Sequence, residues 1–327
     1  MSIKIGIVAL EGCVALSVHG PADLFSTANK VIRQLGLAAE QYETRIISPA
    51  KGNVVSSSGH ELVGETRPLT RGEFDVLLLP GIGADSTEEL DAALSAHKGI
   101  EGQLQAFAQS GGTIAAACTG TFILAQAGLL DGRSATTTWW MADHFRSEFP
   151  RVQLADDDLL VDEGKLITSA AGASSLDLAL HLIGRYSGPN VARLCAKYLV
   201  VDGGRKSQRL YAVPTHSRTR DPMIEKADRW IRSRKGVDVS VDELAGYLGV
   251  GTRTMLRKFR AVTGLTPQAY IQGVCIDLAK PLLEDADASI AQIAALVGFS
   301  DENAFRKAFA RRTGLSPTQY RKQFKWG

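Results

Sequence analysis

The sequence predicts two parts of different fold class, an α/β part with a doubly wound, mostly parallel sheet and an all-α part after it. Two observations support this division. Short apolar runs alternate with amphipathic, helix-like segments from the start of the chain to about residue 187, a pattern typical of a parallel sheet with helices on both faces. From residue 222 onward every strong pattern is helical. A chain of 327 residues is long enough for two domains.

The elements of the α/β part follow one another along the chain. The expected strands are 3–10, 42–48, 74–80, 113–117 and 166–169, and the expected helices are 21–35, 99–110, 121–127 and 175–184. Between residues 202 and 221 the composition changes to Gly, Arg, Lys, Ser, Gln, Thr and Pro, which is typical of a linker. We therefore expect a first domain at 1–201, a linker at 202–221 and a second domain at 222–327.

Composition and charge narrow the class of protein. No apolar run approaches the roughly 18–20 residues needed to cross a bilayer, and the N-terminus lacks a signal peptide's cleavage region, so we expect a cytoplasmic protein with no membrane partner. The four cysteines are scattered without metal-ligand spacing, which favours a reducing compartment; we expect no metal and no cofactor. Residues 222–327 hold 17 Lys and Arg against 11 Asp and Glu, whereas the remainder holds 20 against 24. This asymmetry suggests a polyanionic partner for the C-terminal third.

The C-terminal third contains an internal repeat. Residues 240–250 match 289–299, and the downstream residues Phe259, Gly264, Pro267 and Tyr270 recur as Phe309, Gly314, Pro317 and Tyr320. The offset between the copies grows from 49 to 50 residues, which implies one inserted residue at the second turn. Each copy has a short helix, a glycine that allows a turn and a second helix rich in Arg and Lys. This pattern predicts a double helix-turn-helix domain.

The second helix of each copy presents a polar, mostly basic face. We expect Met255, Phe259 and Val262 to be buried in the first copy, and Phe305 and Phe309 in the second. The outward residues are then Arg253, Arg257, Lys258 and Arg260 in the first copy and Glu302, Asn303, Arg306 and Lys307 in the second. Arg, Lys and Asn are side chains that recognise guanine and adenine edges in the major groove. We therefore expect both helices to bind successive major grooves of double-stranded DNA, although a structural bundle with a solvated basic face is the alternative.

Stretches 265–270, 297–309 and 316–321 resemble the signature of the AraC/XylS family of transcription regulators, over about residues 223–324. The resemblance implies that Arg253, Arg257, Glu302, Asn303 and Lys307 are placed to face bases or phosphates. Two residues depart from the family pattern. Cys275 stands where the helix between the motifs usually begins with arginine, and Pro281 lies inside that helix. Because proline removes a helical hydrogen bond, the angle between the motifs is left open.

The sharpest local feature of the first part is a strand, 113–117, that ends at Cys118 and continues at once into a helix. Such a turn exposes a thiol at a helix N-terminus, where backbone N–H groups and the helix dipole favour the thiolate. A buried, inert cysteine in a tight turn is an equally good interpretation of the same residues.

This first part resembles the PfpI/class I glutamine amidotransferase-like fold of GlxA-type regulators, on stretches 20–25, 79–83, 127–132, 136–139 and 168–172. The resemblance covers roughly residues 3–201. Enzymes of that superfamily pair the cysteine with a histidine and a carboxylate, whereas this chain has Thr138 and Ser17 at those positions, with Ser17 expected near the end of the first strand. A cysteine without a base is poorly equipped for acyl transfer. The domain is therefore interpreted as a degenerate sensor, with His19 the one histidine to check.

Ligands of doubly wound sheets bind at the carboxyl ends of the strands. The candidate ligand-binding residues at that edge are Ser17, Gly81, Ile82, Cys118, Thr119, Thr138 and Trp139. Trp139 and Trp140 are able to stack on a ligand or enclose a cation, although packing is the commoner role of such residues. Regulators with this resemblance often respond to nitrogen-containing metabolites.

The leading hypothesis is a one-component, nucleoid-associated transcription regulator. By resemblance it is an activator that contacts RNA polymerase at promoter DNA, responds to a small-molecule effector and forms a homodimer through its first domain. Two alternatives belong to other classes. A cysteine-dependent hydrolase or amidotransferase-like enzyme tethered to DNA requires a histidine and a carboxylate near Cys118, and a constitutive architectural DNA binder would be indifferent to metabolites.

Overall fold

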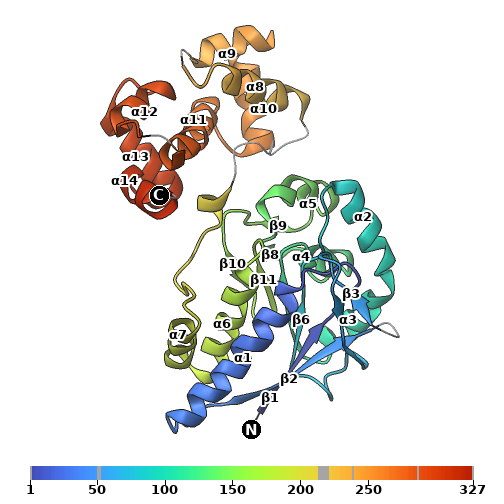
Figure 1. Ribbon diagram of the computed structural model, residues 1–327. Helices are drawn as coiled ribbons and strands as arrows, with labels where there is room; N and C mark the ends of the chain where they lie inside the picture. Colours follow the sequence, from blue (N-terminus) through green and yellow to red (C-terminus); the bar gives the residue numbers. More distant parts are fainter. Residues whose placement is uncertain (1, 50–52, 213–220, 238, 286, 326–327) are drawn as a thin grey trace. The chain divides into compact units, whose positions relative to one another are not determined.

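The computed structural model describes residues 2–49, 53–212, 221–237, 239–285 and 287–325. The chain divides into two compact units, Met1–Gln208 and Arg209–Gly327 (Figure 1). Each unit has an apolar core of its own, as independent domains do. Among the described residues no helix has the length and apolarity that spanning a bilayer requires. Part of the expected linker, residues 213–220, lies outside the described residues.

The first unit is built on a seven-stranded sheet, as far as the described residues show, with the order β10–β11–β7–β6–β1–β2–β5. The strands are β1 (Ser2–Val8), β2 (Gln41–Ser48), β5 (Glu65–Thr66), β6 (Val76–Leu79), β7 (Thr113–Ala117), β10 (Leu160–Asp162) and β11 (Leu166–Ser169). Only the edge pair β10 and β11 is antiparallel among these strands. The central strands β6 and β7 are buried along their whole length, as expected when helices cover both faces. The predicted doubly wound, mostly parallel sheet is confirmed.

Helices form a layer on each side of this sheet (Figure 1). On one side α1 (Leu16–Gln34), α6 (Ser174–Ser187) and α7 (Pro189–Tyr198) pack together, and on the other α3 (Glu101–Gln109) packs against α4 (Gly120–Gln126). The smaller elements are α2 (Thr87–Ala96), α5 (Ala142–Glu148), the hairpin β3 (Val54–Val55) and β4 (Glu61–Leu62), and the pair β8 (Ser134–Ala135) and β9 (Gln153–Leu154). None of these smaller elements was expected from the sequence.

Helix α1 differs from its sequence-based expectation at its N-terminus. The helix begins at Leu16, five residues before Pro21, and the proline is buried inside it. Proline lacks the N–H that would bond to the carbonyl of Ser17, so α1 lacks that hydrogen bond in its second turn. Ser17 consequently belongs to the first turn of α1 and not to the end of β1, which stops at Val8.

The second unit is helical throughout its described residues. Its helices are α8 (Pro222–Ser233), α9 (Val241–Leu248), α10 (Thr252–Thr263), α11 (Pro267–Asp285), α12 (Ile290–Leu296), α13 (Glu302–Thr313) and α14 (Pro317–Phe324). The internal repeat appears in three dimensions as matched capping: Ser240 caps α9 and Ser289 caps α12, each in a reciprocal capping box. From these caps to the start of the next helix the second copy is one residue longer, because α10 starts at Thr252 and α13 at Glu302. The inserted residue inferred from the sequence offset is therefore at the second turn.

Two glycines meet where the first motif joins the second. Gly236 (φ +75°) follows α8 and Gly298 (φ +84°) follows α12, and both adopt the left-handed conformation that favours glycine. A Cβ on Gly298 would overlap the carbonyl oxygen of Gly236, and a Cβ on Gly236 would overlap the sulfur of Cys275. The two motifs approach each other there at backbone distance, with Cys275 buried beneath.

Pro281 and Val262 are two residues of the second unit for which the sequence raised an expectation. Pro281 does not divide the helix that contains it, because α11 continues to Asp285 and the proline ring lies on its exposed side. The expectation that Val262 is buried is wrong, since 37% of that residue is exposed. Met255 and Phe259 are fully buried, but Val262 lies in the last turn of α10, outside the apolar core of this unit.

Candidate functional site

A sharp turn at Cys118 joins β7 to α4 in the first unit. Cys118 has a φ of +58°, a conformation that is strained for a residue with a side chain. Its N–H donates to the carbonyl oxygens of Ser169 at 2.9 Å and Ala170 at 3.0 Å on the neighbouring strand end. Gly81 approaches so closely that a Cβ there would lie 2.9 Å from the Cβ of Cys118. The geometry is that of a nucleophile elbow, and the lack of a side chain at Gly81 leaves space for it.

The Cys118 side chain is buried, with only 5% of the residue exposed. Burial raises the pKa of the Cys118 thiol, and the hydrogen-bonding groups that oppose this shift belong to Gly172, Thr119 and Thr138. The thiol is therefore protonated at neutral pH, because desolvation penalises the thiolate more than those groups stabilise it. Of the two interpretations that the sequence left open, the buried cysteine is the one found in this structure.

Two buried hydroxyl groups near this edge of the sheet have no nitrogen or oxygen hydrogen-bond partner among the described residues, and one of them contacts the Cys118 thiol. They belong to Ser17, which is 3% exposed, and Thr138, which is fully buried. The neighbouring hydroxyl of Thr119 is satisfied, since it donates to the carbonyl of Ile82 at 2.7 Å and accepts from the N–H of Ile82 at 2.6 Å. A buried hydroxyl without a partner is uncommon in folded proteins, which makes Ser17 and Thr138 the notable members of the predicted set.

The remaining candidates at this edge have packing partners. Trp139 and Trp140 contact each other edge to face with their ring centroids 5.2 Å apart, so they do not form two parallel walls of a box. The backbone N–H of Trp139 donates to the side-chain oxygen of Gln208 at 3.2 Å. His19 is exposed on α1, whereas the Cys118 thiol is buried.

A hairpin that sequence reasoning missed packs beside the candidate edge. The N–H of Gly12 donates to Val55 at 2.8 Å, and the N–H of Ser57 donates to Cys13 at 2.9 Å. A Cβ on Gly83 would overlap Ser57, so the β3–β4 hairpin also lies against the loop that holds Gly81 and Ile82. No motif marks this segment in the sequence, because its two strands are each two residues long.

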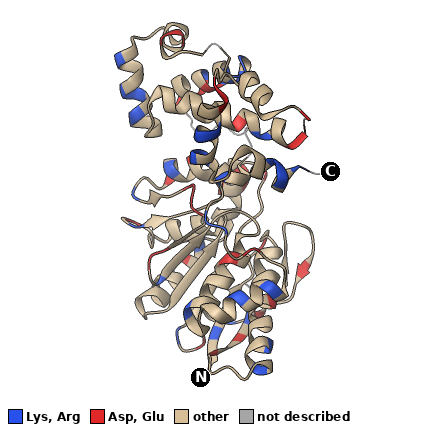
Figure 2. Ribbon diagram, turned by 90° about the vertical axis from the view of Figure 1, so that its left-hand side faces the viewer, with Lys and Arg blue, Asp and Glu red and all other residues tan. Residues whose placement is uncertain are grey.

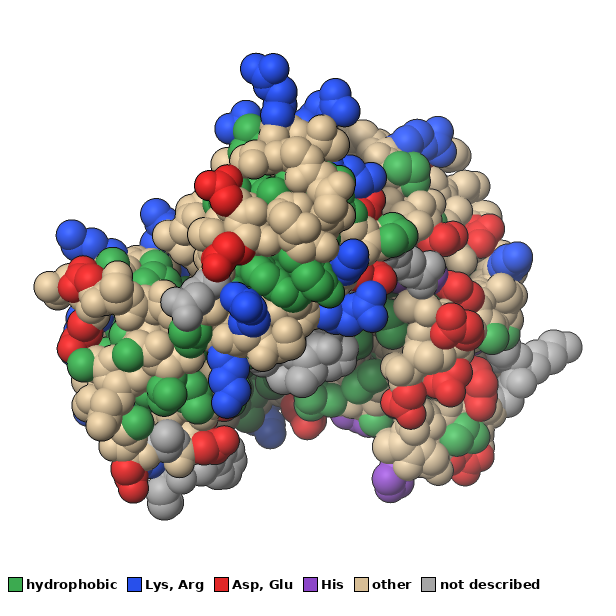
Figure 3. All heavy atoms as spheres, turned by 90° about the horizontal axis from the view of Figure 1, so that it is seen from above, with side chains coloured by type: hydrophobic (Ala, Val, Ile, Leu, Met, Phe, Trp, Pro, Cys, Tyr) green, Lys and Arg blue, Asp and Glu red, His purple; other side chains and the backbone are tan. Residues whose placement is uncertain are grey.

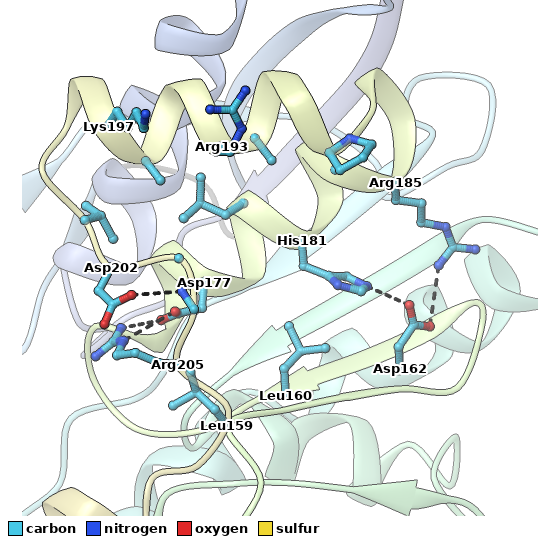
Figure 4. Close-up of a pocket in the computed structure, with 18 of the residues that line it drawn as sticks. Leu159, Leu160, Asp162, Asp177, His181, Arg185, Arg193, Lys197, Asp202 and Arg205 are labelled. Atoms are coloured by element: carbon cyan, nitrogen blue, oxygen red, sulfur yellow. Dashed lines mark hydrogen bonds and ion pairs between the residues drawn. The ribbon is translucent and has the colours of Figure 1, made fainter. Parts of the chain in front are cut away.

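A cavity of about 1150 Å³ lies elsewhere in the first unit, between β10, α6, α7 and residues 200–205 (Figure 4). Asp162 holds His181 at 2.6 Å and Arg185 at 3.5 Å on one side of it. Arg205 pairs with the buried Asp177 on the other side. None of the seven predicted ligand-binding residues lines this cavity. Across the described residues, no cluster of His, Cys, Asp and Glu has the make-up of a metal site.

In the second unit, α10 and α13 are the second helices of the two helix-turn-helix motifs. Each has its aromatic residues in the core, with Phe259, Phe305 and Phe309 fully buried. The opposite face of α10 exposes Arg253 and Arg257. Lys and Arg positions are marked on the helices of this unit in Figure 2, and Figure 3 shows such side chains projecting from the face that it draws.

Ion pairs divide the predicted DNA-binding residues into two groups. Lys258 on α10 binds Asp221 at 2.6 Å, and Arg306 on α13 binds Glu302 at 2.6 Å. Asp221 is also the N-cap of α8; burial acts to raise its pKa, but the Lys258 ammonium and the N–H groups of α8 outweigh this and lower it. The side chains of Arg253, Arg257, Asn303 and Lys307 form no ion pair or hydrogen bond with another described residue. These four side chains therefore need not break an ion pair or hydrogen bond to another described residue before they bind a ligand such as DNA.

Comparison with known families agrees with both units. Residues 4–185 match the DJ-1/PfpI family, and residues 244–323 match a helix-turn-helix domain. The chain belongs to the DJ-1/PfpI family. Its C-terminal unit is an AraC-type helix-turn-helix domain, and the combination of the two is that of a transcriptional regulator.

Curated transcriptional regulators align with most of this chain. The HTH-type transcriptional regulator GbdR of Pseudomonas aeruginosa is 29% identical over 321 residues, which cover 97% of this chain and 84% of that protein. ArgR, a regulator of the same type and organism, is 30% identical over 73% of each chain. GlxA of Rhizobium meliloti is 26% identical over 91% of each chain.

Solved structures support the fold of the first unit. Drosophila melanogaster DJ-1beta matches with a TM-score of 0.50 and 21% identity, over 62% of this chain and all of that one. A ThiJ/PfpI family protein from Pseudomonas syringae matches with a TM-score of 0.50 and 20% identity, over 62% of this chain and 76% of that one. At this identity the likeness concerns the fold alone.

Proposed function

We propose that this DJ-1/PfpI family regulator is an activator that responds to a small metabolite, with a first unit that binds the effector and performs no acyl transfer. The observation that carries the proposal is the buried hydroxyl of Ser17, which has no hydrogen-bond partner among the described residues, together with that of Thr138, which has no nitrogen or oxygen partner there and contacts the Cys118 thiol. Burying a hydroxyl without a partner costs free energy. A ligand that forms a hydrogen bond with such a hydroxyl would recover that free-energy cost, and this favours ligand binding.

The chemistry around Cys118 supports a binding role over a catalytic one. An acyl-transfer cysteine needs a base that takes its proton, and the hydrogen-bonding groups around this thiol come from Gly172, Thr119 and Thr138. None of these groups titrates near neutral pH. The thiol is also held in its protonated form by burial. The enzyme tethered to DNA therefore has less support than the sensor.

The remaining parts of the proposal concern assembly on DNA. Arg253 and Arg257 on α10, with Asn303 and Lys307 on α13, contact bases or phosphates in two successive major grooves. Lys258, Glu302 and Arg306 join them once their internal ion pairs open. The chain works as a homodimer through its first unit, acts at the nucleoid in the cytoplasm, and recruits RNA polymerase to the promoter. A nitrogen-containing metabolite is the proposed class of effector.

A thermal-shift screen of the full chain tests the proposed sensor. The compounds are individual amino acids, betaines and polyamines, each added in large excess. A compound at 100 times its dissociation constant stabilises the folded unit by about 2.7 kcal/mol, which raises Tm by several degrees. We expect at least one compound to do so, and we expect Thr138→Val to abolish its effect, because valine keeps the shape of threonine but removes the hydroxyl.

Thr113→Val is the matched control for that screen. Thr113 is equally buried but lies at the opposite end of β7, so its variant should respond to the compound as wild type does. Loss of the shift in His181→Ala, with retention in Thr138→Val, would place the effector in the cavity beside α6 and α7 and contradict the elbow site. If no compound shifts Tm while the chain selects a defined DNA sequence, the architectural alternative is favoured. Loss of activation in Cys118→Ser with binding intact would favour the enzyme.

A further inference from the structure

Gln208 is anchored in the first unit directly beside the candidate effector site. Its side-chain amide donates to the carbonyl oxygens of Thr137 and Asp156, each at 2.7 Å, and its side-chain oxygen accepts from the N–H of Trp139 at 3.2 Å. Only 2% of Gln208 is exposed. Two of these three residues, Thr137 and Trp139, flank Thr138, and the hydroxyl of Thr137 donates to the carbonyl of Cys118 at 2.8 Å. Gln208 is therefore hydrogen-bonded to the backbone on either side of Thr138.

The residues just before Gln208 are attached to the same unit by their backbone. Leu159 donates its N–H to the carbonyl of Lys206 at 3.0 Å, and Gln208 donates its N–H to the carbonyl of Asp157 at 3.0 Å. The hydroxyl of Ser207 adds a bond to the same Asp157 carbonyl at 2.7 Å. A linker that merely tethers two domains would be solvated, whereas these residues are bound along their length.

The next residues along the chain are anchored in the second unit by a buried lysine. The ammonium of Lys280 on α11 donates to the carbonyl oxygens of Arg209 at 2.8 Å and Ala212 at 3.2 Å. Only 2% of Lys280 is exposed. A buried ammonium requires partners of this kind, because leaving it unpaired costs far more than a neutral group does. Lys280 and the short helical turn Arg209–Tyr211 therefore depend on each other.

The lysine is connected in turn to the second DNA-facing helix. Its nitrogen lies 3.7 Å from a carboxylate oxygen of Asp277, and Asp277 accepts two hydrogen bonds from Arg312, at 2.8 and 3.3 Å. Arg312 stands in the last turn of α13. Gly273 on α11 leaves room for it, since a Cβ there would lie 2.8 Å from the Arg312 guanidinium. The network thus extends from Arg209 to α13 through charged side chains that are largely buried.

We propose that residues 206–212, here called the strap, transmit the state of the effector site to α13, with Gln208 and Lys280 as the positioning residues at its two ends. The inference rests on the proposed sensor function. Gln208 and Arg209 are consecutive, so a change that moves Thr137 or Trp139 acts on the strap without any further contact. Because the Lys280 ammonium must keep its acceptors, displacement of Arg209 or Ala212 shifts Lys280, Asp277 and Arg312 together. DNA affinity then differs between the two states, as coupling requires.

Hydrogen exchange of the full chain, followed by mass spectrometry without ligand or DNA, tests the strap. Gln208→Ala removes the side-chain bonds at the sensor end and changes nothing in the second unit. Charged and buried hydrogen bonds of this kind are each equivalent to roughly a tenfold change in a local opening equilibrium. We expect exchange at residues 206–212 to accelerate roughly tenfold, and exchange in α13 to change by at least about threefold. Unchanged exchange in α13 would overturn the proposal.

Two further variants separate transmission from general loosening. Gln105→Ala is the matched control, because Gln105 also donates from its side chain to a backbone carbonyl of the first unit, that of Ala127 at 2.8 Å; it should leave both peptides unchanged. Lys280→Met removes the ammonium but keeps an unbranched chain. In that background Gln208→Ala should still accelerate the strap and no longer affect α13. An effect on α13 that persists without Lys280 would contradict its role.

The outcome does not depend on the effector screen. If Lys280→Met proves unfolded by circular dichroism, the comparison of Gln208→Ala with Gln105→Ala still decides whether the strap transmits. Because no metabolite is added, a silent thermal-shift screen would count against the sensor function and not against the strap. Unchanged hydrogen exchange in α13 would reject transmission through the strap. Effector binding would still be tested separately, by the thermal-shift screen.

Discussion

Single residues decide how much of each recognition helix is available to DNA. Both helices present charged side chains outward, but Lys258 and Arg306 are held in ion pairs with Asp221 and Glu302. An exposed pair of this kind stabilises the fold little, so its main consequence is to occupy a cation that DNA would otherwise attract. Arg257 and Lys307 have no such contact among the described residues. They are the stronger candidates for direct DNA contacts.

Arg257→Ala should weaken binding to a DNA sequence that the full chain selects from a random pool. The expected loss is about 1–3 kcal/mol, with specificity relaxed at one base pair if Arg257 contacts a base, or with the salt slope reduced by about one if it contacts a phosphate. Fluorescence anisotropy at several salt concentrations measures both. Arg151→Ala, in an exposed pair of the first unit, removes the same charge elsewhere. Equal losses in the two variants would refute a specific role for Arg257.

Cys275 gives the second unit a pH dependence that can be isolated. Burial, with a smaller effect of the nearby Asp277 charge, raises the pKa of the Cys275 thiol from 9.0 to about 11. The folded state then keeps a proton that the unfolded state releases between pH 9 and 11. The thiol's contribution to stability is complete below pH 9 and is lost as pH rises through 11.

Urea unfolding of the full chain at pH 8 and pH 10.5 measures this contribution. A shift of two pKa units corresponds to roughly 2–3 kcal/mol when the loss is complete. Cys275→Ala should be less stable at both pH values because it leaves a small cavity, but it should lose less stability between them. If wild type and variant fall by the same amount, other groups are responsible for the pH dependence.

At the scale of elements, the arrangement of the two motifs depends on the contact between the loops after α8 and α12. Sequence comparison pointed instead to α11 as the uncertain part, because of Cys275 and Pro281. The structure has α11 as one helix, and Cys275 lies beneath Gly236, where an added Cβ would lie 2.5 Å from the Cys275 sulfur. The unusual residue at 275 and the close approach of the loops therefore belong together.

Gly298→Ala should disturb this junction far more than a similar change at another left-handed glycine. Gly298 has both a positive φ and a carbonyl oxygen in the way of a Cβ, whereas Gly249 has a φ of +70° with nothing within 4 Å. We expect Gly249→Ala to cost about 1 kcal/mol of unfolding free energy, and Gly298→Ala roughly 3 kcal/mol or more, since overlap adds to strain. Urea titrations measure both.

The DNA affinity of the same two variants is a second test of the role of this junction. Gly298→Ala should also weaken binding to the selected DNA, because it separates the loops that set the angle between α10 and α13. Gly249→Ala changes only the turn within one motif and should bind nearly as wild type does. Identical stability and affinity for the two variants would mean that the junction does not set the geometry.

For the whole molecule, basic and acidic residues are unevenly distributed between the two parts of the chain. The basic surplus lies in residues 222–327 and the acidic surplus in the remainder, so attraction to a polyanion is confined to the helix-turn-helix unit. The acidic surplus of the remainder offers no such attraction. In the first unit Tyr198, the last residue of α7, is 60% exposed, and Val200 just after it is 92% exposed.

We expect the full chain to be a homodimer, with twice its 35.1 kDa mass in sedimentation velocity. Most homo-oligomers are twofold symmetric, and two paired readers would bind a longer site than one. A fragment of residues 1–208 should retain the dimer, whereas a fragment of 209–327 should sediment as a monomer. A monomeric full chain at micromolar concentration would contradict assembly through the first unit.

The sequence by itself determined the fold classes, the order of the major strands and helices, and the double helix-turn-helix with its inserted residue. It did so because these features are local: apolar periodicity, capping residues and glycine positions act within a few residues of themselves. The same logic identified the elbow at Cys118. It also correctly separated Phe259 and Phe309 from the basic residues on the opposite helix face.

Only the tertiary structure decided which of these residues are buried, paired or left without a partner. Cys118 packs against Gly81, and its N–H bonds to a strand end far away in sequence; Val262 is exposed although it shares a helix with the buried Met255 and Phe259. The pairs Lys258–Asp221 and Lys280–Arg209 join residues 37 and 71 positions apart. Such contacts have no period or motif, because they arise from the meeting of separate elements once the chain has folded.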